Sequence, residues 1–228
     1  MLALTMVSFL QYLIEADTDF FLQVNSWHSP FWDVFMPLYS DKYVWVYFYA
    51  SLLYVIIRNY SLKTTLLWLI AVVVLITFCD QFTASVIRPM VARLRPSNPD
   101  NPLSDMVHVV NGYRGGNYSF PSAHAANSWG LAIFMTLLFR RMWISCTVVL
   151  WAVVTCYSRL YLGVHYFGDL LVGMLIGIFF AFLVYFLLVW IARIKKPLEV
   201  RHAFMPIYIL GITIVCFLTI ASIETYLL

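Results

Sequence analysis

The fold is decided by residues 169–192, which read DLLVGMLIGIFFAFLVYFLLVWIA. After Asp169 this stretch carries no charged side chain. As a helix it is long enough to cross a hydrocarbon core of about 30 Å, which takes about 20 apolar residues. We therefore expect a membrane-spanning helix here.

Five further apolar runs belong with this stretch. The six runs together cover residues 43–57, 64–87, 124–139, 142–158, 169–192 and 206–226. The chain has 228 residues, of which 63% are apolar and 11% charged, and its mean hydropathy is +0.85. Soluble domains average about 45–50% apolar residues. The sequence thus predicts an all-α fold, a polytopic transmembrane helical bundle of about six helices.

The residues before the first run differ in character. Residues 1–14 are apolar, and residues 15–42 alternate acids with aromatic side chains, which favour the headgroup level of a bilayer. We expect interfacial, amphipathic helices over 1–42, with part of an additional span as the alternative for 1–14. A transmembrane domain over 43–192 then holds the polar motifs, and 193–228 forms a basic cytoplasmic loop and an additional C-terminal transmembrane helix.

Basic residues are unevenly shared between the two sides of this bundle. One set of connections holds Arg58, Lys63, Arg140, Arg141, Arg193, Lys195, Lys196 and Arg201. By the positive-inside rule that side is cytoplasmic. The other side holds Arg88, Arg93, Arg95, Arg114 and Arg159, against the rule. A site for an anion on the outer side would explain these five arginines.

Composition also excludes some partners and cofactors. The formal net charge of +3 and the short basic clusters argue against nucleic-acid binding. Only Asp100 and Asp105 supply carboxylates in the polar loops, too few for a magnesium or two-metal site, so we expect no metal and no other cofactor. We expect the cysteines to be unpaired core residues, since all lie in apolar runs: Cys79, Cys146, Cys156 and Cys216.

The first polar block reads RPMVARLRP over residues 88–96. Arg88 and Arg95 are seven residues apart, nearly two turns on one face of a continuous helix. Pro89 disfavours helical geometry at Arg88, so this arrangement requires the helix to kink there instead of ending. Seen alone, the block also fits a basic cluster that binds anionic headgroups.

The second block reads GGNYSFPSAH over residues 115–124 and opens into an apolar run. Free amides at a helix start, together with the Ser122 hydroxyl, suit phosphate oxygens. His124 beside them can donate a proton to a departing alkoxide. The alternative takes Ser122 as an ordinary helix-start residue and His124 as an interfacial histidine.

The third block reads SRLYLGVHYFGD over residues 158–169. Asp169 lies one helical turn after His165, where a carboxylate can fix the tautomer of an imidazole and prepare its other nitrogen for attack. An Arg or Asp at the bilayer centre costs about 2.5–3.5 kcal/mol on insertion scales. Arg159 and Asp169 must therefore line a wet cavity or meet a partner.

In this order the three blocks resemble the motifs of the type 2 phosphatidic acid phosphatase (PAP2) superfamily, K-x6-RP, PSGH and SR-x5-H-x3-D. The resemblance covers about residues 43–192. Arg88 stands where the family has Lys, which keeps the charge and changes the donor geometry. Ala123 stands where the family has Gly, so its amide contact with phosphate depends on the backbone at Ala123.

The resemblance implies a metal-independent membrane lipid phosphatase of the bacterial type. His165 would attack phosphorus and form a phosphohistidine, Asp169 would hold and charge its ring, and His124 would protonate the leaving oxygen. The family pattern assigns phosphate binding to Arg88, Arg95, Ser122, Ala123 and Arg159. The same site in a lipid phosphotransferase, or a non-catalytic lipid-binding or transport protein, are the alternatives.

The expected partners are membrane lipids and one phosphorylated lipid substrate. Undecaprenyl pyrophosphate, phosphatidylglycerol phosphate, phosphatidic acid and lipid A are the candidates. The expected location is the bacterial cytoplasmic (inner) membrane, with the active site at the periplasmic or extracellular face.

A few polar residues have no predicted role. Asp80 lies within the second run, about 12 Å before Arg88 along a helix, too far for a simple ion pair. Arg114 and Asn117 fit either a headgroup contact or a solvated loop. The remaining histidines are expected to be interfacial: His28, His108 and His202.

Overall fold

The computed structural model describes residues 2–194 and 199–226, and its regular elements are helices. They are α1 (Leu2–Asn25), α2 (Pro30–Ser40), α3 (Val46–Asn59), α4 (Leu62–Gln81), η1 (Phe82–Ile87), α5 (Arg88–Val91), η2 (Ser104–Met106), η3 (Val110–Gly112), α6 (Ala123–Phe139), α7 (Met142–Tyr161), α8 (Phe167–Ala192) and α9 (Met205–Tyr226). The described residues form no strand beyond one isolated bridge. The predicted all-α fold is confirmed. Lys195 and Lys196 lie outside the described residues.

Every predicted apolar run is helical, although the helices differ in length. The segments long and apolar enough to cross a membrane are Leu62–Val91, Met142–Tyr161, Phe167–Ala192 and Met205–Tyr226. Helices α3 and α6 are also apolar but shorter. The structure therefore contains four candidate spans among its described residues, and the number of six stays a prediction.

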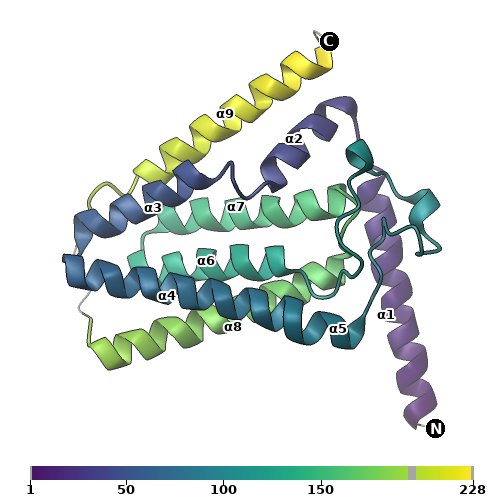
Figure 1. The fold of residues 1–228 in the computed structure, drawn as a ribbon, viewed down its shortest axis with the longest axis horizontal. Helices are drawn as coiled ribbons and strands as arrows, with labels where there is room; N and C mark the ends of the chain where they lie inside the picture. The colour runs from purple at the N-terminus through teal and green to yellow at the C-terminus, as the bar shows by residue number, and fades with distance from the viewer. Residues whose placement is uncertain (1, 195–198, 227–228) are drawn as a thin grey trace.

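The bundle is built around α6, which packs most extensively against α8 and α7 (Figure 1). Small residues let the α6 and α8 backbones approach closely. A Cβ added at Gly177 would collide with the carbonyl oxygen of Ala126, and one at Gly173 with that of Ser122. This contact sets the two helix starts side by side, and the Ser122 amide donates to the Asp169 carbonyl oxygen at 3.0 Å.

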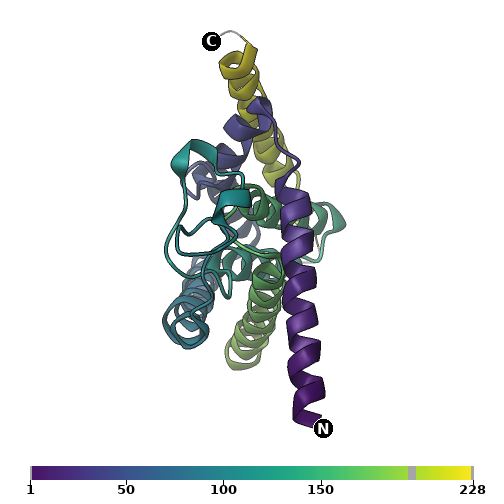
Figure 2. The same cartoon turned by 90° about the vertical axis from the view of Figure 1, so that its right-hand side faces the viewer.

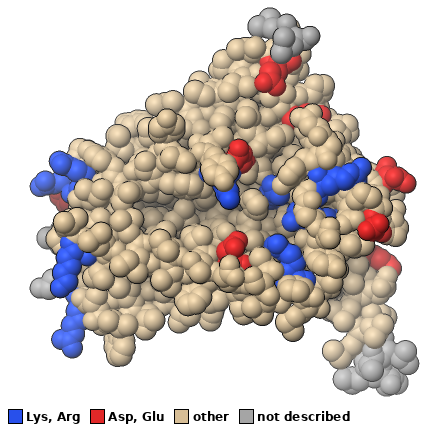
Figure 3. All heavy atoms as spheres, in the orientation of Figure 1, with Lys and Arg blue, Asp and Glu red and all other residues tan. Residues whose placement is uncertain are grey.

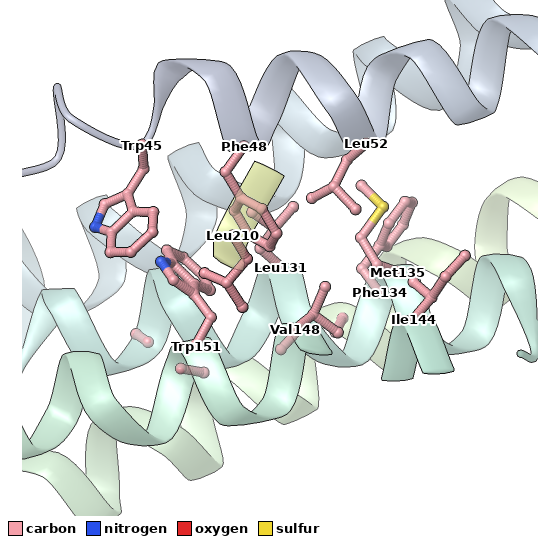
Figure 4. Close-up of a cluster of buried hydrophobic side chains, with 14 of the residues drawn as sticks. Trp45, Phe48, Leu52, Leu131, Phe134, Met135, Ile144, Val148, Trp151 and Leu210 are labelled. Atoms are coloured by element: carbon pink, nitrogen blue, oxygen red, sulfur yellow. The ribbon is translucent and has the colours of Figure 1, made fainter. Parts of the chain in front are cut away.

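A cluster of large buried side chains joins α3 and α9 to α6 and α7 (Figure 4). Trp45 and Trp151 meet edge to face with their ring centroids 6.1 Å apart, a favourable aromatic arrangement. The core accepts only part of the cysteines predicted to fill it. Cys79 is buried, whereas Cys146 and Cys216 are exposed on helix surfaces, so their predicted burial is wrong.

The second apolar run ends in an irregular turn. Helix α4 passes into the π-helical segment η1 and then into α5, whose second residue, Pro89, has no N–H to donate. The chain leaves the helix at Ala92, where φ is +49°. The helix does continue through Arg88, but it ends before Arg95. The prediction that both arginines share one face of a continuous helix is therefore wrong.

The N-terminal segment forms two helices, and the first, α1, continues past the change in composition at residue 14 to Asn25. Helix α1 runs across the end of the bundle, at a steep angle to the central helices, and its start extends beyond them (Figures 1 and 2). Much of its apolar surface is exposed, as at Phe9 and Leu13. Helix α2 begins at the N-cap Ser29 and packs against α9 and α7. The interfacial placement of residues 1–42 stays a prediction.

Candidate active site

The three polar blocks meet at one end of the bundle, the end crossed by α1 (Figure 1). The first block spans α5 and the loop after it. The second block precedes and enters the start of α6, and the third joins the end of α7 to the start of α8. Because each block lies at a helix end, side chains far apart in the sequence converge here.

His165 and Asp169 form the buried centre of this end, with exposures of 1% and 0%. Nδ1 of His165 lies 3.5 Å from Oδ2 of Asp169, and the Tyr166 amide donates to the same oxygen at 2.9 Å. Contacts of catalytic groups are often this long before substrate binds. With Nδ1 turned toward Asp169, Nε2 is the nitrogen left for chemistry.

The charge around His165 is positive. Burial, and after it Arg95, Arg159 and Arg88, hold the pKa of the His165 imidazole well below its usual range. The ring is therefore neutral at pH 7. A neutral imidazole keeps the lone pair that a nucleophile needs.

Two of these arginines are buried and form no ion pair with any carboxylate of the described residues. Arg95 is 8% exposed and donates to the Val164 carbonyl at 3.2 Å, and Arg159 is 3% exposed and donates to the Ser40 hydroxyl at 2.5 Å. Burial, and then Arg159 and Arg88, lower the pKa of Arg95 to about 10, so it stays cationic at pH 7. Buried charges are costly unless paired, and an anion such as phosphate would pair both.

The start of α6 supplies backbone N–H donors, and these do not require a glycine at position 123. Ala123 begins α6 in ordinary helical backbone, so the replacement of Gly requires no unusual conformation. Its amide belongs to the first turn, where amides have no intrahelical acceptor. Ser122 caps the helix, since its Oγ accepts from the Ala125 amide at 3.3 Å. Arg88 joins the first block to the second by donating to the Pro121 carbonyl at 3.0 Å.

A cavity of about 720 Å³ opens beside these groups, between α3, α4 and α6. Its walls are mainly apolar and include Leu52, Val72 and Leu131, whereas Arg88 and His165 line its polar part. The space-filling view shows this face hollowed near its middle, close to charged side chains (Figure 3). A second cavity of about 430 Å³ touches His124 and Arg159. His124 thus borders both cavities.

Two side-chain hydrogen-bond acceptors, on Asn127 and Asp80, line the larger cavity. Oδ1 of Asn127 is buried and has no hydrogen-bond partner among the described residues. Asp80 lines the same cavity, and within the described chain its carboxylate takes part in no ion pair. This placement answers where Asp80 points, which its position in the sequence left open.

Sequence reasoning gave Arg93 no role, yet it contacts the motif carboxylate. Its Nη1 lies 2.8 Å from Asp17 and 3.1 Å from Asp169, and its guanidinium carbon lies 3.6 Å from the centre of the Tyr166 ring. The only signal was its place among the outer-side arginines. Ser40 and Tyr113, which both accept from Arg159, carried no signal at all.

The loop residues Arg114 and Asn117 hold the backbone near Arg95. Arg114 donates to the Ser97 carbonyl at 2.5 Å, and the Ser97 hydroxyl donates back to the Arg114 carbonyl at 3.2 Å. The Asn117 carbonyl accepts from the Arg95 amide at 3.1 Å. These contacts tie the loop that carries Arg95 in place.

Two of the histidines predicted to be interfacial contact each other. His28 and His108 stack with ring centroids 3.7 Å apart, and Nε2 of His108 lies 2.8 Å from Asp33. Their ligand atoms lie close enough to hold a metal ion. Parallel rings, however, direct their lone pairs side by side instead of toward one point. His202 is exposed and contacts the Tyr54 ring.

The sequence of this chain is similar to those of known proteins. A sequence model of the PAP2 superfamily matches residues 65–193. A lipid A 4'-phosphatase of Bacteroides thetaiotaomicron is 51% identical over 178 residues, which cover 78% of this chain and 79% of that protein. A lipid A 4'-phosphatase of Porphyromonas gingivalis is 36% identical over 179 residues, 77% of this chain and 74% of that protein.

A solved structure has a similar fold. It is a transmembrane PAP2 type phosphatidylglycerolphosphate phosphatase from Bacillus subtilis, with a TM-score of 0.59 and 21% identity. The match covers 81% of this chain and 89% of that one. At this identity the likeness concerns the fold alone.

Proposed function

The chain belongs to the PAP2 superfamily and is a membrane lipid phosphatase, and from this premise we propose that it hydrolyses a phosphate ester of a lipid A-type glycolipid through a phosphohistidine at His165. One observation carries the mechanism. A neutral, buried imidazole lies beside its carboxylate at the wall of an apolar cavity. Arg95 and Arg159 lie near it and form no ion pair within the part of the chain that the structure describes.

The first step transfers the phosphoryl group to the protein. The lone pair of Nε2 of His165 forms a bond to phosphorus while the bond from phosphorus to the lipid oxygen breaks. That oxygen keeps the electron pair and takes a proton from the ring of His124, which is protonated once the bound phosphate anion offsets the positive charge of the surrounding arginines. Asp169 stabilises the positive charge on His165, and Arg95 and Arg159 bind the equatorial oxygens as charge shifts.

The second step releases phosphate. The water oxygen bonds to phosphorus while its proton passes to His124, and the bond between phosphorus and Nε2 breaks, so that the electron pair returns to His165. The smaller cavity, which borders His124 and Arg159, offers a place for water and departing phosphate. All proton transfers use this chain's own side chains, so we propose that hydrolysis needs no metal.

The larger cavity is suited to a lipid with a polar, hydrogen-bond-donating headgroup. Its apolar walls fit acyl chains next to the phosphate site. The unpartnered Oδ1 of Asn127 calls for ligand donors, because buried polar groups without partners are destabilising, and the half-buried Asp80 carboxylate lines the same cavity as a second acceptor. Sugar hydroxyls and amide N–H groups of lipid A can supply them, whereas a polyprenyl chain cannot. The two relatives named lipid A 4'-phosphatase support the same choice.

The site is further proposed to face the outside of the bacterial inner membrane. Exposed basic residues gather at the other end of the bundle, for instance Arg58, Lys63 and Arg140 (Figure 3). Basic residues outside functional sites favour the cytoplasmic side. Phosphate binding accounts for Arg88, Arg95 and Arg159 at the site end. Arg93 and Arg114 are accounted for by contacts within the protein, so these five arginines do not count against the orientation.

The proposal is tested by phosphate release from a panel of purified lipids in detergent micelles. The panel contains lipid A, undecaprenyl pyrophosphate, phosphatidylglycerol phosphate and phosphatidic acid, each with and without EDTA. We expect the fastest release from lipid A, unchanged by EDTA. His165→Ala should abolish release, and the matched control His202→Ala, at an exposed position, should retain it. Inhibition by EDTA would overturn the metal-free mechanism.

The choice of lipid has its own variant. Asp80→Ala should slow release from lipid A and leave release from undecaprenyl pyrophosphate unchanged, because only the former offers donors to this carboxylate. An equal effect on both lipids would show that Asp80 does not select the headgroup.

A further inference from the structure

The carboxylate of Asp169 is held on both of its oxygens. Oδ2 accepts from the Tyr166 amide at 2.9 Å, and Oδ1 accepts from Nη1 of Arg93 at 3.1 Å. The Asp169 side chain is fully buried, so it needs such partners in order to stay charged. Together the two contacts orient Oδ2 toward Nδ1 of His165, which lies 3.5 Å away.

Arg93 is in turn fixed from two other directions. Nη1 also contacts Oδ2 of Asp17 at 2.8 Å, so one nitrogen bridges two carboxylates. The guanidinium lies over the Tyr166 ring at 3.6 Å, within the range of a cation–π contact. The Arg93 side chain is 23% exposed, whereas that of Asp169 is 0% exposed. Arg93 therefore connects the buried Asp169 carboxylate to Asp17, which lies nearer the surface.

Asp17 completes this chain of contacts from the N-terminal helix. Its Oδ1 accepts from the Gly168 amide at 2.8 Å, directly before Asp169. A Cβ at position 168 would lie 2.9 Å from Oδ2 of Asp17, so a side chain there would displace the Asp17 carboxylate. Asp17 lies on α1, outside the residues matched by the superfamily. Helix α1, which crosses the end of the bundle, is thus hydrogen-bonded to the first turn of α8.

We propose that Arg93 and Asp17 are positioning residues for the phosphoryl transfer, and that the Asp17–Arg93–Asp169 chain sets which nitrogen of His165 attacks. Nδ1 of His165 makes no hydrogen bond in this structure and lies 3.5 Å from Oδ2 of Asp169. A fixed Asp169 would accept from Nδ1–H when this contact tightens around the substrate, which leaves Nε2 unprotonated toward the phosphate. This inference rests on the proposed function. It adds that the contact of α1 with the bundle supports the active site, although none of the described α1 residues lines either cavity.

Kinetics of three variants test the proposal, with lipid A in detergent micelles or, if another panel lipid is turned over faster, with that lipid. Arg93→Gln should lower kcat by about 10- to 100-fold with little change in KM, as loss of a partner behind a histidine–carboxylate unit does. Asp17→Asn should lower kcat by a smaller factor, and Arg93→Lys should recover part of the loss. The matched control is Asp19→Asn, an exposed acid on the same helix, which should behave as wild type.

A double variant separates positioning from folding. If Arg93 acts through Asp169, then Arg93→Gln should add no further loss in an Asp169→Asn background. Additive losses, a raised KM at unchanged kcat, or wild-type kcat in Arg93→Gln while His165→Ala is inactive would each overturn the inference. Inactivity of the wild type on every lipid would instead overturn the proposed function.

The tautomer of His165 gives a readout that needs no turnover. The chain has five histidines, few enough for ¹⁵N imidazole signals to be assigned by substitution. The wild type should show His165 protonated at Nδ1, and Arg93→Gln should show a mixture of tautomers. An unchanged Nδ1–H signal in a folded Arg93→Gln protein would contradict the inference even if the substrate were misassigned.

Discussion

Both ends of the bundle carry arginines, but their surroundings are opposite. At the site end Arg95 and Arg159 are buried and donate to carbonyl and hydroxyl oxygens. At the other end Arg58 and Arg140 are exposed (Figure 3). A hydrated arginine can set the orientation of a membrane protein. A buried arginine that has no carboxylate partner is already desolvated and held in place. An anion that enters the site can therefore bind it without the cost of removing water from the guanidinium or reorienting it.

The sidedness of the two ends gives an all-or-none test. In a chain with its four cysteines replaced, Asp105→Cys places one thiol at the site end and Lys63→Cys places one at the other, both at exposed positions. In intact bacterial cells a membrane-impermeant maleimide should label the first variant, and should label the second only after permeabilisation. The reverse pattern would place the site in the cytoplasm.

The arginines themselves give the next largest effect. Arg159→Gln and Arg95→Gln should each lower kcat by about 10²- to 10³-fold, as loss of one group that stabilises transition-state charge does. Arg58→Gln is the matched control at the other end and should stay within about 2-fold of wild type, since exposed charges contribute little. A comparable loss in all three variants would mean that burial does not distinguish the two ends.

The seam between α6 and α8 holds the groups of the site end together, and a glycine substitution tests it. Gly177→Ala places a methyl group against the Ala126 carbonyl and should destabilise the protein by about 1–3 kcal/mol. Activity should fall with it, because α6 and α8 carry His124 and Asp169. Gly211→Ala in α9 meets open space and is the control. Thermal unfolding in detergent measures both, and equal stability would contradict the packing argument.

The smallest expected effect is a shift in pH dependence. Burial and the arginines lower the pKa of His165, so its neutral, attacking form persists below the usual imidazole range. Arg159→Gln removes a positive charge, which raises the His165 pKa and moves the acid limb of kcat/KM to higher pH. Comparing wild type and variant on one lipid cancels the ionisation of the substrate. An unmoved acid limb would show that the arginine charge does not reach His165.

Sequence patterns predicted what depends on local order along the chain. Long apolar runs predicted the helices to within a few residues, because a bilayer span has a minimum length. Motif spacing predicted which polar residues gather, since Arg88, His124 and His165 all line one cavity. The shared helical face of Arg88 and Arg95 was not realised, because the chain leaves the helix at Ala92.

The contacts that the patterns missed all join distant parts of the chain. Arg93 is 76 residues from both Asp17 and Asp169, and Asp17 is 151 residues from Gly168. The stacking of His28 on His108 arises in the same way. Helical periodicity cannot predict such pairs, because they depend on how α1 and the outer loop pack on the bundle. Exposed Cys146 and Cys216 show a related point, since in a membrane an apolar residue can face lipid as well as the core.

The central claim is a covalent phosphate on His165, and trapping that adduct tests it most directly. The purified protein is mixed with lipid A carrying ³²P in its phosphate ester, quenched with alkali within a turnover, and mapped by mass spectrometry. We predict an alkali-stable, acid-labile label on His165 that is absent in His165→Ala and present in the His202→Ala control. Turnover without a label, or a label on another residue, would contradict the account.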